Sequence, residues 1–236
     1  MLKKYNKKSD VSYSIGVFPT IELLQNRGRA VLKVVISPKG HKNKGVEKII
    51  SLCKKIGVRV EESQKSIDFL SKSGNTYAIG VYKKFQSLLN AENNHLVLVN
   101  PEDMGNLGTI CRSMLAFGFR DLAIIKPAVD VFNPKVCRAS MGATFKINIE
   151  YLDSFEEYQE KFKRNLYMFM TDAKNSLSEV SFEEPYSLVF GSESAGLDPN
   201  FKDFGENVKI FQTSEVDSLN LAIAVGIALH KVAIGK

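Results

Sequence analysis

Apolar and polar residues alternate with two different periods along the first third of the chain. Apolar positions recur at helical spacing in residues 14–27 and 45–57 and in a shorter stretch around Ile67. Between these stretches, runs rich in valine and isoleucine predict strands at residues 31–37, 58–60 and 77–82. This order of elements predicts a small α/β unit.

The rest of the chain alternates regularly between short apolar runs and stretches with helical spacing. The apolar runs predict strands at residues 95–99, 121–125, 146–149, 166–171, 186–191 and 208–211. Helices are predicted after Asn106 and at residues 134–141, 155–162 and 216–231. Because parallel strands need helical crossovers that cover both faces of their sheet, this alternation predicts a largely parallel sheet between two layers of helices.

A polar stretch without periodicity, SLLNAENN at residues 87–94, separates the two parts. It has the composition of a linker. We therefore expect two domains, at residues 1–90 and 94–236.

The charges divide at the same place. Residues 1–88 carry 18 Lys and Arg against 6 Asp and Glu, whereas the remaining residues carry 14 against 20, so the total of +6 conceals parts of +12 and −6. A basic surface of this kind fits a polyanion, RNA or DNA, because lysines that neutralise phosphates release condensed counterions. A basic surface that serves only solubility explains the charge equally well.

Composition argues against several other classes of protein. A hydrophobic content of 44% is enough for a packed core. No apolar run approaches the roughly 20 residues that span a bilayer, and the first ten residues lack the apolar stretch of a signal peptide, so we expect a cytoplasmic protein without a membrane partner. The three cysteines and three histidines are scattered without a C-x-x-C pair, so we expect neither a disulfide framework nor a metal site.

The first stretch with chemical potential, residues 100–119, places one arginine in an apolar helix. If the helix starts near Leu107, Arg112 points away from the face formed by Ile110, Met114 and Phe117. Gly105 and Gly108 permit a turn with exposed N–H groups, and such a turn before a helix favours an anion such as a phosphate. A plain turn followed by a solvated arginine fits the spacing as well.

A second glycine loop follows the strand at residues 186–191. Gly191 and Gly196 have the spacing of the two P-loop glycines, but Leu197 and Asp198 stand where that motif needs Lys and Ser or Thr. The G-x-G-x-x-G fingerprint of dinucleotide-binding folds is missing too. Taken alone, Glu193 in this loop suits a capping carboxylate as well as a catalytic one.

Two further polar turns precede helices. Asp217 and Ser218 are good N-cap residues for the last helix, where Asn220 also lies and where either capping or substrate contact fits. Lys135 and Arg138 are one helical turn apart and could share a phosphate, although a solvated helix face explains them equally well.

Together, these stretches resemble the SpoU (TrmH-like) class of the SPOUT superfamily, which methylates ribose 2′-hydroxyls of RNA with S-adenosylmethionine. The first family motif is matched by Asn106, Leu107, Gly108, Arg112, Ser113 and Gly118. The second is matched by Gly191, Glu193, Gly196 and Leu197, and the third by Ser218, Leu219 and Asn220. The resemblance covers residues 95–236, and residues 12–84 more weakly resemble the substrate-binding domain that often precedes this catalytic domain.

The resemblance implies a fold, an activity and a set of site residues. The fold is α/β, a SPOUT-type mostly parallel sheet with a C-terminal trefoil knot that forms the cofactor pocket, in a homodimer whose site lies at the subunit interface. The activity is metal-free transfer of a methyl group to RNA, with rRNA expected before tRNA. The implied catalytic residues are Arg112, Asn106, Glu193, Ser218 and Asn220. The implied cofactor-binding residues are Gly191, Ile210, Ser218 and Leu219.

The sequence also departs from the family pattern. Where the family commonly has Ile-Pro-Met and then Gly, this chain has Ile210, Phe211, Gln212 and Ser214, which bears on the shape of the cofactor pocket. The N-terminal part lacks the His-Gln-Gly of many relatives, so the resemblance does not transfer an RNA target. Two alternatives stay open: a non-catalytic RNA-binding protein that retains the knotted fold, and a nucleotide-binding α/β enzyme of another reaction type.

Overall fold

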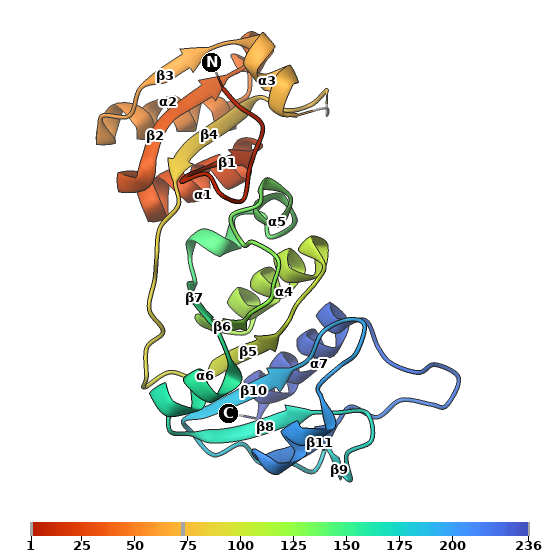
Figure 1. Cartoon of the computed structure of the whole chain (residues 1–236). Coiled ribbons are helices and arrows are strands. Elements are labelled where there is room, and N and C mark those ends of the chain that lie inside the picture. The colour runs from red at the N-terminus through yellow and green to blue at the C-terminus, as the bar shows by residue number, and fades with distance from the viewer. Residues whose placement is uncertain (1, 72–73, 236) are drawn as a thin grey trace. The chain divides into compact units, whose positions relative to one another are not determined.

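The computed structural model describes residues 2–71 and 74–235, and Figure 1 shows the course of the chain. The chain forms two compact units. The first unit contains the residues up to Phe85 together with Asp130–Lys146, and the second contains Gln86–Val129 and the residues from Ile147 onward. The chain therefore passes from one unit to the other three times.

The first unit is built on a four-stranded sheet in the order β1-β4-β2-β3, in which β1 and β2 are antiparallel to β4, and β3 is parallel to β2. Its strands are β1 (Val11–Ile15), β2 (Val31–Ile36), β3 (Val60–Glu62) and β4 (Ala78–Lys83). Its helices are α1 (Val17–Arg27), α2 (Lys44–Ile56), α3 (Gln64–Leu70) and α5 (Pro134–Ala139). The predicted small α/β unit is thus present.

Strand β1 differs from the prediction, which had begun a helix at residue 14. Ser12 and Ser14 make the strand look polar, yet both are fully buried. The hydroxyl of Ser12 donates to the carbonyl of Phe132, and that of Ser14 accepts a hydrogen bond of 3.2 Å from the backbone N–H of Gly80. The strand is stabilised by partners distant in sequence, which local periodicity does not reveal.

Residues 130–146 complete the core of the first unit. Cys137 and Phe145 belong to the same buried cluster as the apolar residues of α1, β2 and α2. The ring of Phe145 meets that of Tyr82 edge-on at a centroid distance of 5.3 Å. Lys146 pairs with Glu22 of α1 at 2.6 Å, and the Glu22 side chain is only 10% exposed. The segment is therefore part of the packing of this unit.

Assigning the segment to the first unit sharpens the charge division. The first unit contains 21 Lys and Arg against 7 Asp and Glu, a net charge of +14, whereas the second contains 11 against 19, a net charge of −8. By its net charge, the first unit attracts a polyanion, whereas the second unit repels it.

The second unit holds a seven-stranded sheet in the order β7-β6-β5-β10-β8-β11-β9, and every neighbouring pair of strands is parallel. The strands are β5 (His95–Val99), β6 (Asp121–Ile125), β7 (Asn148–Leu152), β8 (Asn165–Phe169), β9 (Asn175–Ser176), β10 (Tyr186–Phe190) and β11 (Glu206–Lys209). The helices are α4 (Met104–Ala116), α6 (Phe155–Lys161) and α7 (Leu221–Ile234). The predicted largely parallel sheet is confirmed.

Helices cover this sheet. Phe155 and Tyr158 of α6 pack in one buried cluster with Val97 and Ala123 of the central strands. Helices α4 and α7 lie side by side (Figure 1). The rings of Phe117, just after α4, and His230 of α7 meet at a centroid distance of 5.7 Å. Among the described residues, no helix combines the length and apolar character that crossing a bilayer requires.

Candidate active site

Three loops leave the same edge of the second unit's sheet; two carry motif residues, and the first leads into α4, which carries the first motif. They follow β5, β10 and β11 and comprise residues 100–103, 191–205 and 210–220. Because these strands are parallel, their carboxyl ends meet at one edge, where open α/β sheets bind their ligands. The topology therefore brings together residues that lie more than 100 positions apart.

Hydrogen bonds join three of the predicted catalytic residues. The amide nitrogen of Asn106 donates to the Oε1 atom of Glu193 at 3.0 Å, and the amide nitrogen of Asn220 donates to the Oδ1 atom of Asn106 at 3.1 Å. The Oδ1 atom of Asn220 in turn accepts from the backbone N–H groups of Ala222 and Ile223 at the start of α7. The Asn106 amide is thus held in one orientation.

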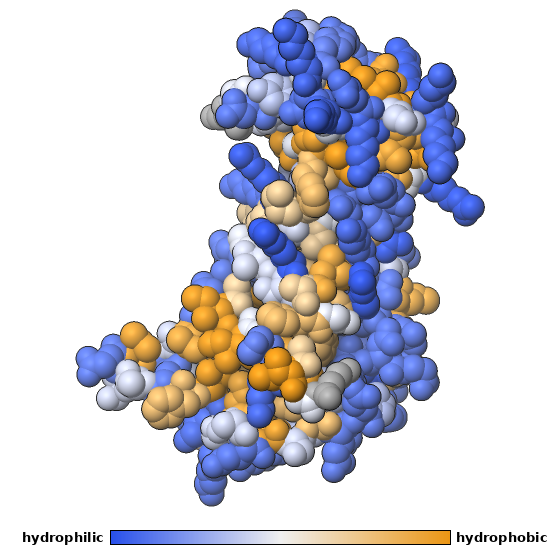
Figure 2. Space-filling model, turned by 180° about the vertical axis from the view of Figure 1, so that it is seen from behind, coloured by the Kyte–Doolittle hydropathy of each residue, from blue (hydrophilic) through white to orange (hydrophobic). Residues whose placement is uncertain are grey.

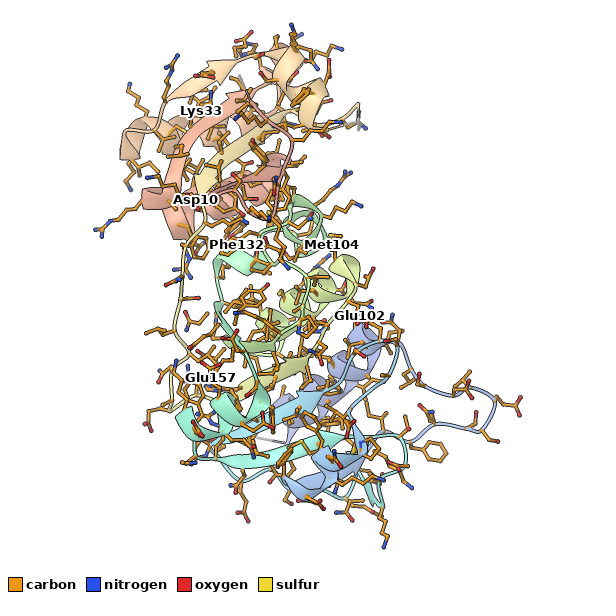
Figure 3. All side chains as sticks on the ribbon, in the orientation of Figure 1. Asp10, Lys33, Glu102, Met104, Phe132 and Glu157 are labelled. Carbon is orange, nitrogen blue, oxygen red and sulfur yellow. The ribbon has the colours of Figure 1, made fainter. Side chains whose placement is uncertain are left out.

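The start of α4 differs from the prediction, and the residues before it bind the carboxylate of Glu193. The helix begins at Met104 rather than near Leu107, so Gly105 and Gly108 lie within it and do not form a turn. The backbone N–H groups of Glu102 and Asp103 donate to the carboxylate of Glu193 at 2.8 and 3.2 Å. Figure 3 labels Glu102, which precedes α4, and Met104, where the helix begins. Of the N–H groups that could have bound a phosphate at this turn, these two bind the Glu193 carboxylate.

The two glycines of the second loop allow its close folding. Residues 192 and 196 exchange backbone hydrogen bonds of 3.2 and 3.0 Å, and Gly196 has a positive φ of 69°. A Cβ atom on Gly191 would lie only 1.9 Å from the carbonyl carbon of Gly196. Close packing of the loop on itself, not contact with a phosphate, requires glycine at position 191.

A cavity of about 270 Å³ lies between the second and third loops. Gly191, Ile210, Ser218 and Leu219, the four predicted cofactor-binding residues, all line it. Apolar side chains such as Phe169 and Phe190 form other parts of its wall, together with the carboxylate-bearing residue Asp217. The structure thus collects these four residues around one space, and their role there stays a prediction.

Asn220, rather than Asp217 or Ser218, caps α7. Its side chain binds the first free N–H groups of the helix, so the two residues that we expected as caps precede the helix and face the cavity instead. Gln212, one of the departures from the family pattern, lines the cavity as its expected bearing on the pocket implies, and its side-chain nitrogen donates to the carbonyl of Asp217 at 3.0 Å. Sequence reasoning missed Thr171, which also lines the cavity and which no motif marks.

Arg112 is outside the hydrogen-bonded network. It is exposed, as predicted, and its guanidinium makes no hydrogen bond or ion pair with any residue that the structure describes. Six residues of helix place it roughly 9 Å along the axis from Asn106 and about 120° around it. Its neighbour Cys111 is buried, and burial raises the pKa of that thiol to about 12, so a thiolate nucleophile is not available here.

The other polar residues singled out in the sequence lie elsewhere. Lys135 and Arg138 are exposed on α5, in the first unit. Within the described ranges, no group of three or more His, Cys, Asp or Glu side chains is arranged to hold a metal ion.

Comparisons with known proteins agree with the motifs. A model of the SpoU rRNA methylase family matches residues 93–230, more than half of the chain. An uncharacterized tRNA/rRNA methyltransferase of Synechocystis is 38% identical over 140 residues, which cover 58% of this chain and 51% of that protein. A 23S rRNA (adenosine(1067)-2′-O)-methyltransferase of Streptomyces laurentii is 26% identical, and the match covers 78% of this chain and 73% of that protein.

Solved structures show the same fold. The SpoU methyltransferase AviRb from Streptomyces viridochromogenes, in complex with the cofactor AdoMet, superposes with a TM-score of 0.82 at 21% identity, over 98% of this chain and 94% of that one. The chain therefore shares the α/β fold of this SpoU methyltransferase, and the C-terminal knot stays a prediction. The chain belongs to the SpoU rRNA methylase family, and the resemblance inferred from the three motifs is confirmed.

Proposed function

We propose that the protein transfers a methyl group from S-adenosylmethionine to a ribose 2′-hydroxyl of RNA, with rRNA as the expected substrate and tRNA as the second choice. The observation that carries this proposal is the network of Asn106, Glu193 and Asn220 beside a cavity lined by all four predicted cofactor-binding residues. Family membership and the AdoMet complex of AviRb support it.

The cavity suits such a cofactor in its chemistry. S-adenosylmethionine supplies a methyl group on a positively charged sulfonium, and it presents an adenine ring, ribose hydroxyls and an amino acid group. The apolar walls formed by residues such as Phe190 and Leu219 fit the ring. Asp217 and Ser218 offer oxygen atoms that can accept hydrogen bonds from hydroxyl and amino groups.

The protein side chains have separate tasks in this proposal. Glu193 fixes the Asn106 amide, and Asn220 ties Asn106 to the start of α7, so the amide is preorganised for the reacting groups. Arg112 brings a permanent positive charge to the RNA phosphate and the 2′-hydroxyl. A guanidinium stays protonated in proteins and is a poor base, so the main role of Arg112 is positioning, and proton removal by Arg112 is the secondary role.

The test of the reaction is a map of 2′-O-methylated nucleotides in total RNA from cells with and without the protein. We expect one methylated nucleotide to disappear in its absence, which names the RNA and the position. An unchanged map together with no binding at millimolar S-adenosylmethionine in calorimetry would contradict the proposal and favour the alternative of a non-catalytic RNA-binding protein.

The proposed roles of the two units follow from their net charges. The first unit, with a net charge of +14, is proposed as the RNA-binding domain, and the second, with −8, as the methyltransferase domain. The predicted domain limits, 1–90 and 94–236, then need residues 130–146 to be assigned to the RNA-binding domain as well. An RNA-modifying role also fits the predicted cytoplasmic location.

The homodimer expected from the resemblance is supported by the surface of α7. Ile223 and Ile234 are 56% and 67% exposed, and Ile227 between them is also exposed. Figure 2 shows apolar side chains gathered on the face of the second unit where α7 lies. Contiguous exposed apolar surface of this kind is typical of protein interfaces. A site at a subunit interface can combine residues of both subunits. A partner subunit at this face is therefore consistent with the position of Arg112 outside the Asn106 network.

Ile223→Asp is expected to give a monomer in analytical ultracentrifugation, because a charge within an apolar interface costs several kcal/mol when buried. Leu88→Asp is the matched control, since Leu88 is 72% exposed but lies outside α7. A wild-type protein that sediments as a monomer at all concentrations would contradict the dimer.

A further inference from the structure

We propose that residues 3–8 form an ordered strip of lysines that binds the phosphate backbone of RNA. This strip, KKYNKK, precedes β1 and includes Lys3, Lys4, Lys7 and Lys8. That the polyanion is RNA rests on the proposed function. That the strip is ordered rests on the contacts seen in the structure.

Polar contacts hold the backbone of the strip at both ends and in the middle. The hydroxyl of Tyr13 donates to the carbonyl of Lys3 at 2.6 Å, and the ammonium group of Lys84 donates to the carbonyl of Lys7 at 2.8 Å. Between them, the hydroxyl of Tyr5 donates to a carboxylate oxygen of Asp130. These three contacts engage two backbone carbonyls and a tyrosine, and no ammonium group of the strip.

The central contact belongs to a largely buried ion pair. Lys84 and Asp130 are paired at 2.9 Å, with their side chains 17% and 11% exposed, and the Lys84 ammonium lies 5.0 Å from the centre of the Tyr5 ring. Leu2 and Tyr5 also pack against the buried cluster that contains Tyr13 and Val81. The apolar side chains of this stretch thus face the core of the unit.

The lysine side chains face the opposite way. Lys3, Lys4 and Lys8 are exposed, and none of their ammonium groups pairs with any residue that the structure describes. Four positive charges within six residues repel one another, and a flexible segment would separate them. Here the contacts with Tyr13, Lys84 and Asp130 hold them together, so the chain has already lost the conformational entropy that a mobile segment loses on binding.

RNA fits this strip better than a membrane surface does. Segments that bind lipid headgroups combine lysines with apolar side chains that enter the acyl region, and in this strip Tyr5 is turned inward. The rest of the first unit extends the positive charge, with a net value of +14. A long flexible polyanion can contact the strip and other lysines of the unit at once, and each phosphate contact releases counterions.

The experiment compares two full-length double variants with the wild type. Lys3→Gln/Lys4→Gln removes charge from the strip, whereas Lys163→Gln/Lys174→Gln removes the same charge from exposed positions of the second unit. Binding of a fluorescein-labelled single-stranded RNA of mixed sequence is measured by anisotropy over a series of salt concentrations. We expect the first variant to bind more weakly, with a plot of log affinity against log salt that is shallower by roughly 1.4, about 0.7 for each lysine. The control variant should bind as the wild type does.

A second variant tests whether the order of the strip matters. Tyr5→Phe keeps every charge and the packed ring but removes the hydroxyl bond to Asp130. We expect a several-fold loss of RNA affinity with an unchanged salt slope, together with faster tryptic cleavage after the strip lysines. Wild-type RNA affinity of Tyr5→Phe would overturn the claim that order contributes, and wild-type affinity of the lysine variant would overturn the strip as a binding surface.

Anionic lipid vesicles serve as the competing probe. If the lysine variant loses binding to vesicles of phosphatidylserine and phosphatidylcholine but keeps its affinity for RNA, the strip binds membranes and the proposal is wrong. RNA binding is measured here without cofactor, so failure of the strip is distinguishable from failure of methyl transfer. A wild type that binds RNA through the strip but modifies no nucleotide would contradict only the reaction.

Discussion

Replacing Arg112 by alanine is expected to lower the rate of methyl transfer to RNA about 100-fold or more while leaving the affinity for S-adenosylmethionine unchanged. Removal of one preorganised group that stabilises developing charge has effects of about this size. Arg112 lies on α4, outside the cavity lined by the predicted cofactor-binding residues, and has no structural partner among the described residues. The variant should therefore fold normally and lose only the interaction of the guanidinium with the RNA phosphate and the 2′-hydroxyl.

Single-turnover transfer of a labelled methyl group and calorimetric titration with the cofactor measure the two quantities separately. Arg112→Lys keeps the charge without the planar fork, so we expect it to recover only part of the rate. Arg120→Ala is the control, because Arg120 is exposed just beyond the same helix. A wild-type rate in Arg112→Ala would remove Arg112 from the reaction.

The isolated fragment of residues 1–90 is expected not to fold, although sequence reasoning places a complete domain there. The core of the first unit includes Cys137 and Phe145, and Glu22, which is almost buried, pairs with Lys146. Without these residues the fragment exposes apolar core surface and leaves the Glu22 carboxylate without its partner. In circular dichroism, we expect no cooperative thermal transition.

The matched comparison is a chain in which residues 1–85 are joined by a flexible glycine-serine linker to residues 130–146. This chain contains the whole first unit, and we expect it to unfold in a single cooperative transition. Equal melting temperatures for the two fragments would show that residues 130–146 contribute nothing to the stability of the unit.

Prediction from sequence succeeded where an element is buried on both sides or has one clear apolar face. Strand β5 was predicted at its observed limits, because five consecutive buried residues leave little ambiguity. The outward direction of Arg112 was predicted as well, because the buried Ile110 and Met114 fix the orientation of α4.

Prediction failed where distant partners decide the local structure. The two serines of β1 have partners in residues 132 and 80, which no local pattern reveals. The start of α4 was misplaced for a local reason, because the side chain of Asp103 accepts from the backbone N–H of Asn106 and caps the helix there. In the hydrogen-bonded network, Glu193 is 87 positions from Asn106 in the sequence, and Asn220 is 114 positions from it. Only the family resemblance, not periodicity, grouped these three residues in advance.

The three passages of the chain between the units impose an order on folding during synthesis. A ribosome releases the chain from its N-terminus, and domains that are continuous in sequence fold as soon as they emerge. The first unit cannot do so, because its core waits for Phe145 and its ion pair for Lys146. By then β5, α4 and β6 of the second unit have already been made. The first unit therefore stays incompletely folded on the ribosome until β5, α4 and β6 of the second unit have been synthesised. Folding of the first unit thus depends on how far synthesis of the second unit has progressed.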